Sequence, residues 1–338
     1  MGPTGLPFDD IRNLLSQLPG PDEDAAAAVR ARDGDLVKPP GSLGRLEEIA
    51  EWLARWQGKA PPAVTRPVVA IFAASHGVVV RGVAARPIKV NRQMVETFAA
   101  GGAAINQLCA GADLGLKVFD LALDMPSGDI ALGPALDERD CAATIAYGME
   151  AVAGGTDLLC LGEMGVGNTT IAAALSAALF GGNGADWAGR GTGIDDAGLQ
   201  RKRDAVDAAL AVHAGHLDDP LEVLRRLGGR EFAAIAGAIL AARFQRVPVI
   251  LDGYAVTAAA AVLFRMAPGA IGHCLLGHLS AEPGHARLAA ELGLTPLLDL
   301  GLSIGEGSGA ALAAMIVKAA AATHAGMATF EAAGVSRG

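Results

Sequence analysis

A single carboxylate, Glu306, lies between two glycines near the end of the chain, in the segment GLSIGEGSG (301–309). Apolar segments precede and follow this turn, so few polar side chains are expected around the acid. Apolar surroundings raise the pKa of a carboxylate and make it a better base near neutral pH, although the dipole of a following helix opposes that shift. The glycines leave room for a flat substrate. From the residues alone, two interpretations of Glu306 stay open, a structural acid at a helix start and a general base.

A second glycine-rich turn, GEMGVGNTT (162–170), lies between an apolar strand-like segment and a helical segment. Gly165 and Gly167 permit a tight turn and close approach of a ligand, and the free N–H groups of the helix start favour an anion. The spacing is that of a P-loop, but Asn168 stands where a P-loop has lysine. The turn, which includes Val166, predicts a cradle for one phosphate; an ordinary strand–helix turn is the alternative.

Two charged residues could complete such a site. Glu163 lies in the same turn, where a carboxylate is either catalytic or sugar-binding, or a helix-start acid favoured by the dipole. Lys202 lies in a charged helical segment (193–210) and either reaches a phosphate or belongs to a solvated helix face.

Three histidines and an acid occur in GHCLLGHLSAEPGH (272–285), namely His273, His278, His285 and Glu282. Their spacing matches no common metal-binding pattern, so we interpret them as cap and loop residues and predict no metal site.

The elements that must position these residues alternate along the chain. Short apolar segments without period-2 alternation are typical of strands buried on both faces; they cover 67–74, 116–123, 157–162, 248–253, 272–277 and 296–302. Helical patterns lie between most of them, including 91–109, 139–153 and 230–245. This alternation predicts an α/β fold with a doubly wound parallel sheet, in which ligands bind at the carboxyl ends of the strands. Both glycine turns lie at such ends.

The amino-acid composition of the chain argues against several classes of function. The chain has 338 residues, is 51% hydrophobic but only 4% aromatic, and carries a net charge of −9. No basic tract is present, which argues against nucleic-acid binding. The four cysteines form no C-x-x-C pair, and neither a signal peptide nor an uncharged apolar run of about 18 residues occurs. These features predict a cytoplasmic protein with buried thiols that does not span a membrane.

Four motifs occur here in a characteristic order: KPPGSLGRLEEIA (38–50), GEMGVGNTT (162–170), GHLSAEPGH (277–285) and LGLSIGEGSGAALA (300–313). From about Lys38 to Lys318 the chain closely resembles the nicotinate-nucleotide:dimethylbenzimidazole phosphoribosyltransferase family of cobalamin synthesis. The resemblance implies transfer of 5-phosphoribose from nicotinate mononucleotide to 5,6-dimethylbenzimidazole, giving α-ribazole 5′-phosphate and nicotinate. It also implies a homodimer without metal or cofactor.

The resemblance implies a fold and site residues as well. The fold is a Rossmann-like parallel sheet with helices on both faces (61–309), plus a small helical domain from both chain ends (1–60 and 310–338). Glu306 matches the general base and Glu163 the second acid of the site. Gly165, Lys202 and Ser280 match positions near the nucleotide and its phosphate. Gly305 is expected to contact substrate, and the base pocket is expected to include His76, Ile88, Met164 and Ile304.

The chain departs from the family pattern in ASHG (74–77) and ARPIKVN (85–91). Ser75 replaces an acid, and other expected residues are replaced by Arg86, Ile88, Lys89 and Asn91. Because this loop helps to wall the base pocket in the family, another benzimidazole, a purine or a phenol is an alternative acceptor.

Two other functions are alternatives to phosphoribosyl transfer. A P-loop-like phosphohydrolase is argued against by Asn168 in place of the lysine. A catalytically silent nucleotide-binding module is argued against by the presence of Glu306.

Overall fold

The computed structural model describes residues 7–337. Its centre is a five-stranded sheet in which every pair of neighbouring strands is parallel, in the order β2-β1-β3-β4-β5. The strands are β1 (Pro67–Ala73), β2 (Gly115–Asp120), β3 (Leu158–Met164), β4 (Val249–Leu251) and β5 (Cys274–Leu276). The chain leaves β1 towards one edge and β3 towards the other, so the sheet has its switch point between these two strands. That is where an open α/β sheet forms a ligand crevice.

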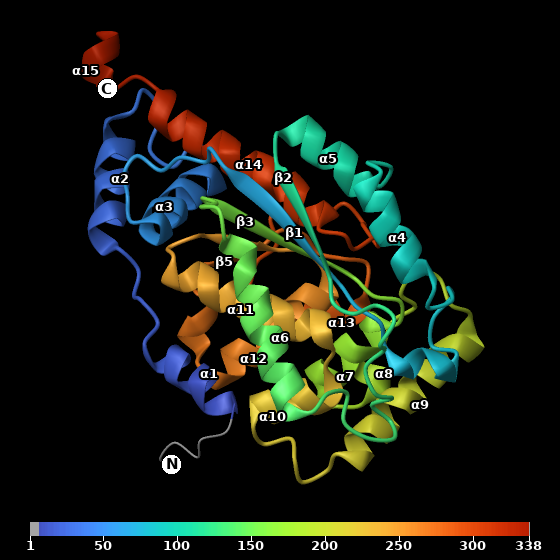
Figure 1. The fold of residues 1–338 in the computed structure, drawn as a ribbon. Coiled ribbons are helices and arrows are strands. Elements are labelled where there is room, and N and C mark those ends of the chain that lie inside the picture. Colours follow the sequence, from blue (N-terminus) through green and yellow to red (C-terminus); the bar gives the residue numbers. More distant parts are fainter. Residues whose placement is uncertain (1–6, 338) are drawn as a thin grey trace.

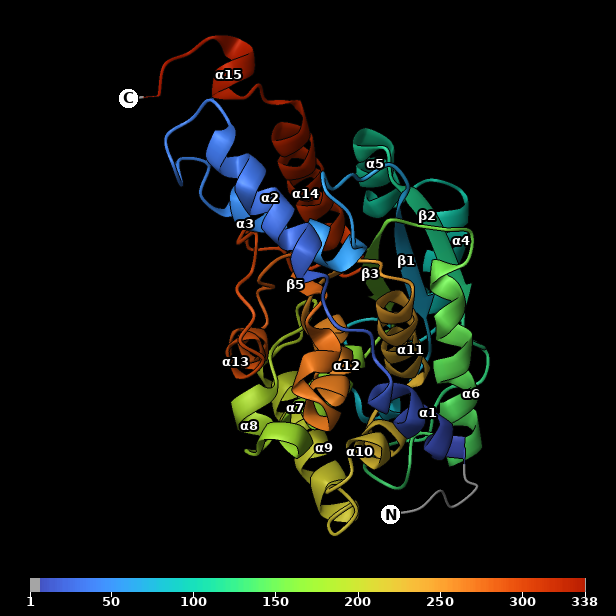
Figure 2. The same ribbon diagram turned by 90° about the vertical axis from the view of Figure 1, so that its left-hand side faces the viewer.

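Helices cover both faces of this sheet, as Figures 1 and 2 show. On one face, Phe72, Leu161 and Leu251 are buried in the same core as α6 (Glu138–Gly148), α7 (Asn168–Phe180), α10 (Pro220–Leu227), α11 (Arg230–Phe244) and α12 (Tyr254–Met266). On the other face, Ile71 and Cys160 are buried with α3 (Arg45–Gln57), α4 (Val90–Ala99), α5 (Ala104–Ala112) and α14 (Ser308–Gly326). Burial on both faces explains why the strands lack alternation. The predicted α/β class and parallel sheet are confirmed.

Two predicted elements differ from the structure. The segment 296–302 is not a strand: Leu298 forms only an isolated bridge to His278, and Gly301 has a left-handed φ of 66° that ends the extended conformation. The predicted helix 91–109 is two helices, because Gly101 adopts a φ of 78° between α4 and α5.

Close contact between helices explains how a core forms with so few aromatic residues. Where α6 crosses α11, a Cβ on Gly148 would lie 1.9 Å from the carbonyl oxygen of Ala234, and one on Gly237 would lie 1.8 Å from that of Ile145. Only glycine lets the two backbones approach this closely.

Elements from the two chain ends lie side by side in Figure 1. Helix α2 (Glu23–Asp35) packs with α3, and the Arg32 guanidinium donates to carbonyls of residues 324, 325 and 327 at the end of α14. Helix α1 (Pro7–Ser16) instead lies against α6, with Phe8 and Ile11 in the core of that face. The division into a small helical domain and a large α/β domain stays a prediction.

The remaining helices are α8 (Gly184–Trp187), α9 (Asp196–Val212), α13 (Pro283–Glu291) and α15 (Phe330–Ala333). Among the described residues, one helix, α14, is long and apolar enough to cross a membrane by length and composition. Half of that helix is buried inside the protein, as is common for a core helix.

Candidate active site

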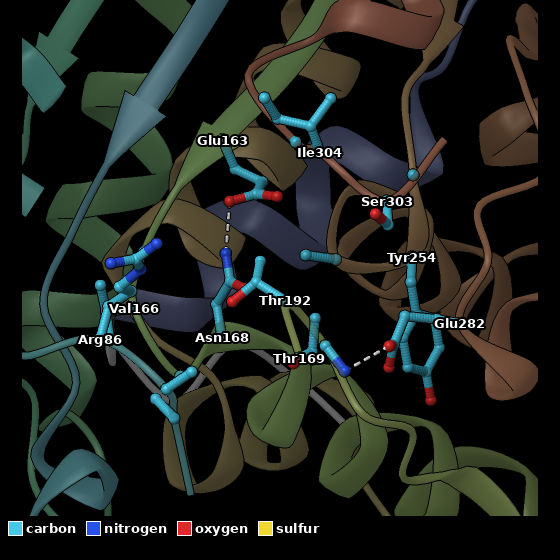
Figure 3. A pocket seen from close by; sticks show the side chains of 18 of the residues that line it. Arg86, Glu163, Val166, Asn168, Thr169, Thr192, Tyr254, Glu282, Ser303 and Ile304 are labelled. Carbon is cyan, nitrogen blue, oxygen red and sulfur yellow. Dashed lines mark hydrogen bonds between the residues drawn. The ribbon is translucent and has the colours of Figure 1, made fainter. Parts of the chain in front are cut away.

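A cavity of about 390 Å³ opens at the carboxyl ends of β1 and β3. Its walls come from the loop after β1, the turn after β3, the loop between α8 and α9, and the segment before α14. In Figure 3, Arg86 and Val166 lie on one side of the cavity, Glu282 and Tyr254 lie on the other, and Glu163 lies between them. The cavity is therefore at the switch point of the sheet.

The turn around Glu306 is strained and closely packed. Glu306 has a φ of 70°, a left-handed conformation that is costly for a residue with a side chain, and its N–H donates to the Glu163 carbonyl oxygen at 3.1 Å. A Cβ on Gly162 would lie 2.5 Å from the Gly307 nitrogen, and one on Gly305 would lie 2.5 Å from Glu163 Oε1. Glycines at these positions thus let the Glu306 turn lie directly on the end of β3.

Asp252, which the sequence analysis missed, holds this turn in place through hydrogen bonds to its backbone. It follows β4, is fully buried, and its carboxylate accepts hydrogen bonds from the N–H groups of Gly307 (3.2 Å) and Ala310 (2.9 Å). The Nε2 atom of His278 lies 3.4 Å from Asp252 Oδ1. Asp252 therefore caps α14 and positions Glu306. An acid directly after a buried strand was the available signal, as it was for Glu163.

The environment of Glu306 favours the protonated acid. Its side chain is 5% exposed, and Oε2 has no hydrogen-bond partner among residues 7–337. Burial raises the pKa of Glu306, the negative charge of Asp252 adds to this shift, and the backbone N–H of Ile105 opposes it. A carboxylate of this kind holds a proton more tightly than a solvated one, which suits a general base.

Glu163 differs from Glu306 in its contacts. Its Oε2 accepts a hydrogen bond from Asn168 Nδ2, drawn as a dashed line in Figure 3. Burial, followed by the charges of Glu231 and Asp252, raises the pKa of Glu163 to about 8, against the opposing effect of the Asn168 hydrogen bond. Glu163 is therefore mostly protonated at pH 7 in the ligand-free protein.

The opposite end of the cavity is cationic. Lys202 is 1% exposed, and its Nζ donates to Thr169 Oγ1 (2.6 Å) and to the Gly189 carbonyl oxygen (3.0 Å). Glu282 Oε2 lies 3.9 Å from the same nitrogen. Burial lowers the pKa of Lys202 to about 8, and Glu282 partly offsets this effect. The interpretation of Lys202 as part of a solvated face is wrong, because α9 turns it inwards against the start of α7.

Ser280 lines the cavity and is held by a histidine. The Nδ1 atom of His285 accepts from the Ser280 N–H at 3.0 Å and lies 2.9 Å from Ser280 Oγ, while its Nε2 lies 3.0 Å from Thr257 Oγ1. His273 Nε2 lies 3.0 Å from the Ile239 carbonyl oxygen. Within residues 7–337, no group of three His, Cys, Asp or Glu side chains is arranged to hold a metal ion.

The structure gathers most of the residues singled out from the sequence around this cavity. The lining includes Glu163, Met164, Gly165, Val166, Gly167, Asn168, Lys202, Ser280, Ile304, Gly305 and Glu306. The sequence analysis did not single out Thr169, Arg190 and Thr192, which also line it. Thr169 belongs to the motif GEMGVGNTT, which was the available signal, whereas Arg190 and Thr192 belong to no motif and are brought to the cavity by the loop between α8 and α9.

Two predicted base-pocket residues do not line the cavity. His76 is fully buried with its Nε2 2.5 Å from Glu231 Oε1, so its ring supports the Gly165 turn from behind. Ile88 faces a separate surface hollow that Lys89 and Arg92 also line. The expectation that His76 and Ile88 line the base pocket is therefore wrong. The His76 side chain points towards α11, and Ile88 lies outside the cavity.

Two departures from the family pattern lie in direct contact. Asn91 Nδ2 donates to Ser75 Oγ at 3.0 Å and to the Ala74 carbonyl oxygen at 2.9 Å, while its Oδ1 accepts from the Val166 N–H at 2.8 Å. Ser75 and Asn91 are both buried. Together they tie the end of β1 to the turn after β3, which is a structural role.

Comparison with known proteins adds to this geometry. A family model described as phosphoribosyltransferase matches residues 18–335. The chain is 67% identical over 336 residues to the nicotinate-nucleotide–dimethylbenzimidazole phosphoribosyltransferase of Rhizobium rhizogenes, and 99% of each chain is covered. Identity and coverage are the same for the enzyme of that name from Rhizobium meliloti.

Solved structures agree with the sequence relatives. A crystal structure of CobT from Thermus thermophilus is 46% identical, covers 93% of this chain and 100% of its own, and superimposes with a TM-score of 0.88. A second structure from the same organism, named for the nicotinate-nucleotide–dimethylbenzimidazole enzyme, gives 44% identity, coverage of 94% and 100%, and a TM-score of 0.87. The chain therefore belongs to the nicotinate-nucleotide–dimethylbenzimidazole phosphoribosyltransferase family.

Proposed function

We propose that this protein transfers 5-phosphoribose from nicotinate mononucleotide to 5,6-dimethylbenzimidazole, producing α-ribazole 5′-phosphate and nicotinate for cobalamin synthesis. The observation that carries the proposal is the strained turn that presents Glu306 beside Glu163 in a cavity with Lys202 at its other end. The names of the relatives support the two substrates.

The two ends of the cavity suit the two parts of the donor. Lys202, Thr169 and the N-terminus of α7 supply positive charge and hydrogen-bond donors for the 5′-phosphate. Gly305 and the backbone of the turn lie beside the acids, where the ribose and the bases would meet. Met94, Met164 and Ile304 line this end and suit flat aromatic rings.

The proposed step is an in-line displacement at C1′ of the ribose. One imidazole nitrogen of the acceptor forms a bond to C1′ while the bond from C1′ to the pyridinium nitrogen breaks, and its electron pair stays on nicotinate. The leaving group departs from a cationic nitrogen, so it needs no proton from a general acid. The second imidazole nitrogen gives its proton to Glu306. Attack from the opposite side inverts β to α.

Glu163 is proposed to stabilise the positive charge on the ribose as the pyridinium bond breaks. The pyridinium nitrogen of the bound donor, and the positive charge that develops at C1′, would favour the ionised form of Glu163, because opposite charges attract in a site of low polarity. Glu163→Gln is expected to lower the turnover number about tenfold, which corresponds to about 1.4 kcal/mol. Steady-state kinetics with saturating substrates measure this effect, and an unchanged turnover number would count against the role.

The activity is tested by chromatography of purified protein incubated with nicotinate mononucleotide and a panel of bases. We expect nicotinate release with 5,6-dimethylbenzimidazole and formation of the α-ribotide. Release only with another benzimidazole, a purine or a phenol would keep the reaction and change the acceptor. Saturable binding of nicotinate mononucleotide without release under any condition would instead identify a silent binding module.

The proposal includes a homodimer in the cytoplasm, as the family resemblance implies. The four cysteines support a reducing compartment, because all are unpaired and buried.

A further inference from the structure

Three cationic side chains line the cavity among the described residues, and two of them are already engaged. Lys202 contacts Thr169 and Gly189 at the phosphate end. The Arg190 guanidinium forms an ion pair with Asp196 and donates to the Ile194 carbonyl oxygen at 3.2 Å. Arg86 is the third, and no residue in the range 7–337 makes a hydrogen bond or an ion pair with its side chain.

Arg86 and Lys202 lie on different sides of the cavity, because Arg86 lies across it from Glu282 and Lys202 Nζ is 3.9 Å from Glu282 Oε2. Arg86 follows Val83, Ala84 and Ala85 in the loop after β1, and these three residues also line the cavity. Figure 3 shows the Arg86 side chain next to Val166, across the cavity from Glu282. A guanidinium without a partner among residues 7–337 therefore lines the side of the cavity away from Lys202, so an anion that it binds would be distinct from the 5′-phosphate.

The acids of the cavity do not neutralise this charge. Glu163 is hydrogen-bonded to Asn168 and mostly protonated at pH 7, and the Glu306 carboxylate is buried in its own turn. The third acid of the lining, Glu282, lies 3.9 Å from Lys202 Nζ and accepts from the Gly191 N–H, and none of the three forms an ion pair with the guanidinium. Arg86 is thus free to bind an anion carried by a ligand, and a planar guanidinium suits a carboxylate best because both groups can form two parallel hydrogen bonds.

We infer that Arg86 binds the carboxylate of the donor's pyridine ring and selects nicotinate mononucleotide over nicotinamide mononucleotide. This inference rests on the proposed function. The carboxylate keeps its charge throughout the reaction, because the bond that breaks is at the ring nitrogen. The contact therefore stabilises the bound donor and the transition state equally, so it affects KM and leaves kcat nearly unchanged.

The test compares Arg86→Gln and Arg86→Lys with the unmodified protein, using both mononucleotides. Calorimetry is expected to show that Arg86→Gln weakens binding of nicotinate mononucleotide about tenfold, a change of about 1.4 kcal/mol. Binding of nicotinamide mononucleotide should stay within about twofold, because the neutral amide gains little from the cation. Arg86→Lys should restore part of the affinity. In turnover, the change should appear in the KM of the donor.

Arg92→Gln is the matched control, because this arginine of α4 pairs with Asp124 and does not line the cavity. Its donor affinities should equal those of the unmodified protein. Equal weakening of both mononucleotides by Arg86→Gln, no weakening of either, or a rise only in the KM of the acceptor base would overturn the inference. Selective weakening without any nicotinate release would support Arg86 as the selector and contradict the proposed reaction instead.

Discussion

Glu306→Gln is expected to reduce the turnover number by about 10²–10⁴-fold, the usual contribution of a general base. Glutamine has the same shape and keeps the left-handed backbone, but it cannot accept the imidazole proton. The KM values of both substrates should change little, since the side chain acts in the transition state. Nicotinate release measured by chromatography gives the rate. The exposed acid Glu291, at the end of α13, supplies the control Glu291→Gln, which should keep full activity.

The pH dependence of the turnover number tests the role of Glu306 independently, because its direction is defined. Burial raises the pKa of Glu306, so the fraction of ionised base falls as the pH drops through that raised value. Turnover should therefore decline on the acidic side, at a higher pH than a solvated glutamate would give. The residual rate of Glu306→Gln should lack the part of this decline that Glu306 causes, and the double variant with Glu163→Gln should lack it altogether. A variant that keeps more than about a tenth of the turnover number would contradict the assigned role, because one base contributes at least about 10².

Lys202→Met is expected to weaken binding of nicotinate mononucleotide by about 10–150-fold, which corresponds to about 1.5–3 kcal/mol for a hydrogen bond to a charged group. The methionine occupies similar space but leaves the buried Glu282 carboxylate and the Gly189 carbonyl without their partner, so the variant should be less stable and its binding is measured well below its Tm. Calorimetry with nicotinate mononucleotide measures the loss. Lys318→Met is the matched control, because Lys318 also donates to backbone carbonyls (Ala112 and Asp113) but does not line the cavity.

Binding by Lys202 should also depend on pH in a defined direction. Burial lowers the pKa of Lys202 to about 8, so the ammonium is present below that pH and is lost as the pH rises through it. Affinity of the unmodified protein for nicotinate mononucleotide should therefore fall above about pH 8. The same titration of Lys202→Met should show no such fall. Equal affinity of the two proteins at pH 7 would show that the phosphate binds elsewhere.

The sequence alone was sufficient for the features that depend on local patterns. Apolar segments without alternation predicted the buried parallel strands, because a strand covered on both faces has no solvated positions. Glycines around Glu163 and Glu306 predicted tight turns, although the strand expected before Glu306 is absent and its turn instead lies against the end of β3. In the structure, Lys202 and most of the residues singled out in these turns line one cavity.

The direction of individual side chains required the tertiary structure. His76 was expected in the base pocket but turns towards Glu231 on α11, a residue far away in the sequence. Lys202 lies among charged neighbours that resemble a solvated face, yet it is buried against Thr169. The direction of a side chain depends on which elements pack against each other. The spacing of residues in the sequence does not contain this information.

The sequence by itself determined the α/β class, the two glycine turns and the acids that they carry, because backbone conformation follows local residue type. Only the tertiary structure decided that Asp252 supports Glu306, that Glu163 and Glu306 line one cavity, and that Arg86 has no partner within residues 7–337. The physical reason is that burial, shifted pKa values and unpaired charge arise from contacts between distant segments, and these exist only once the sheet has brought the segments together.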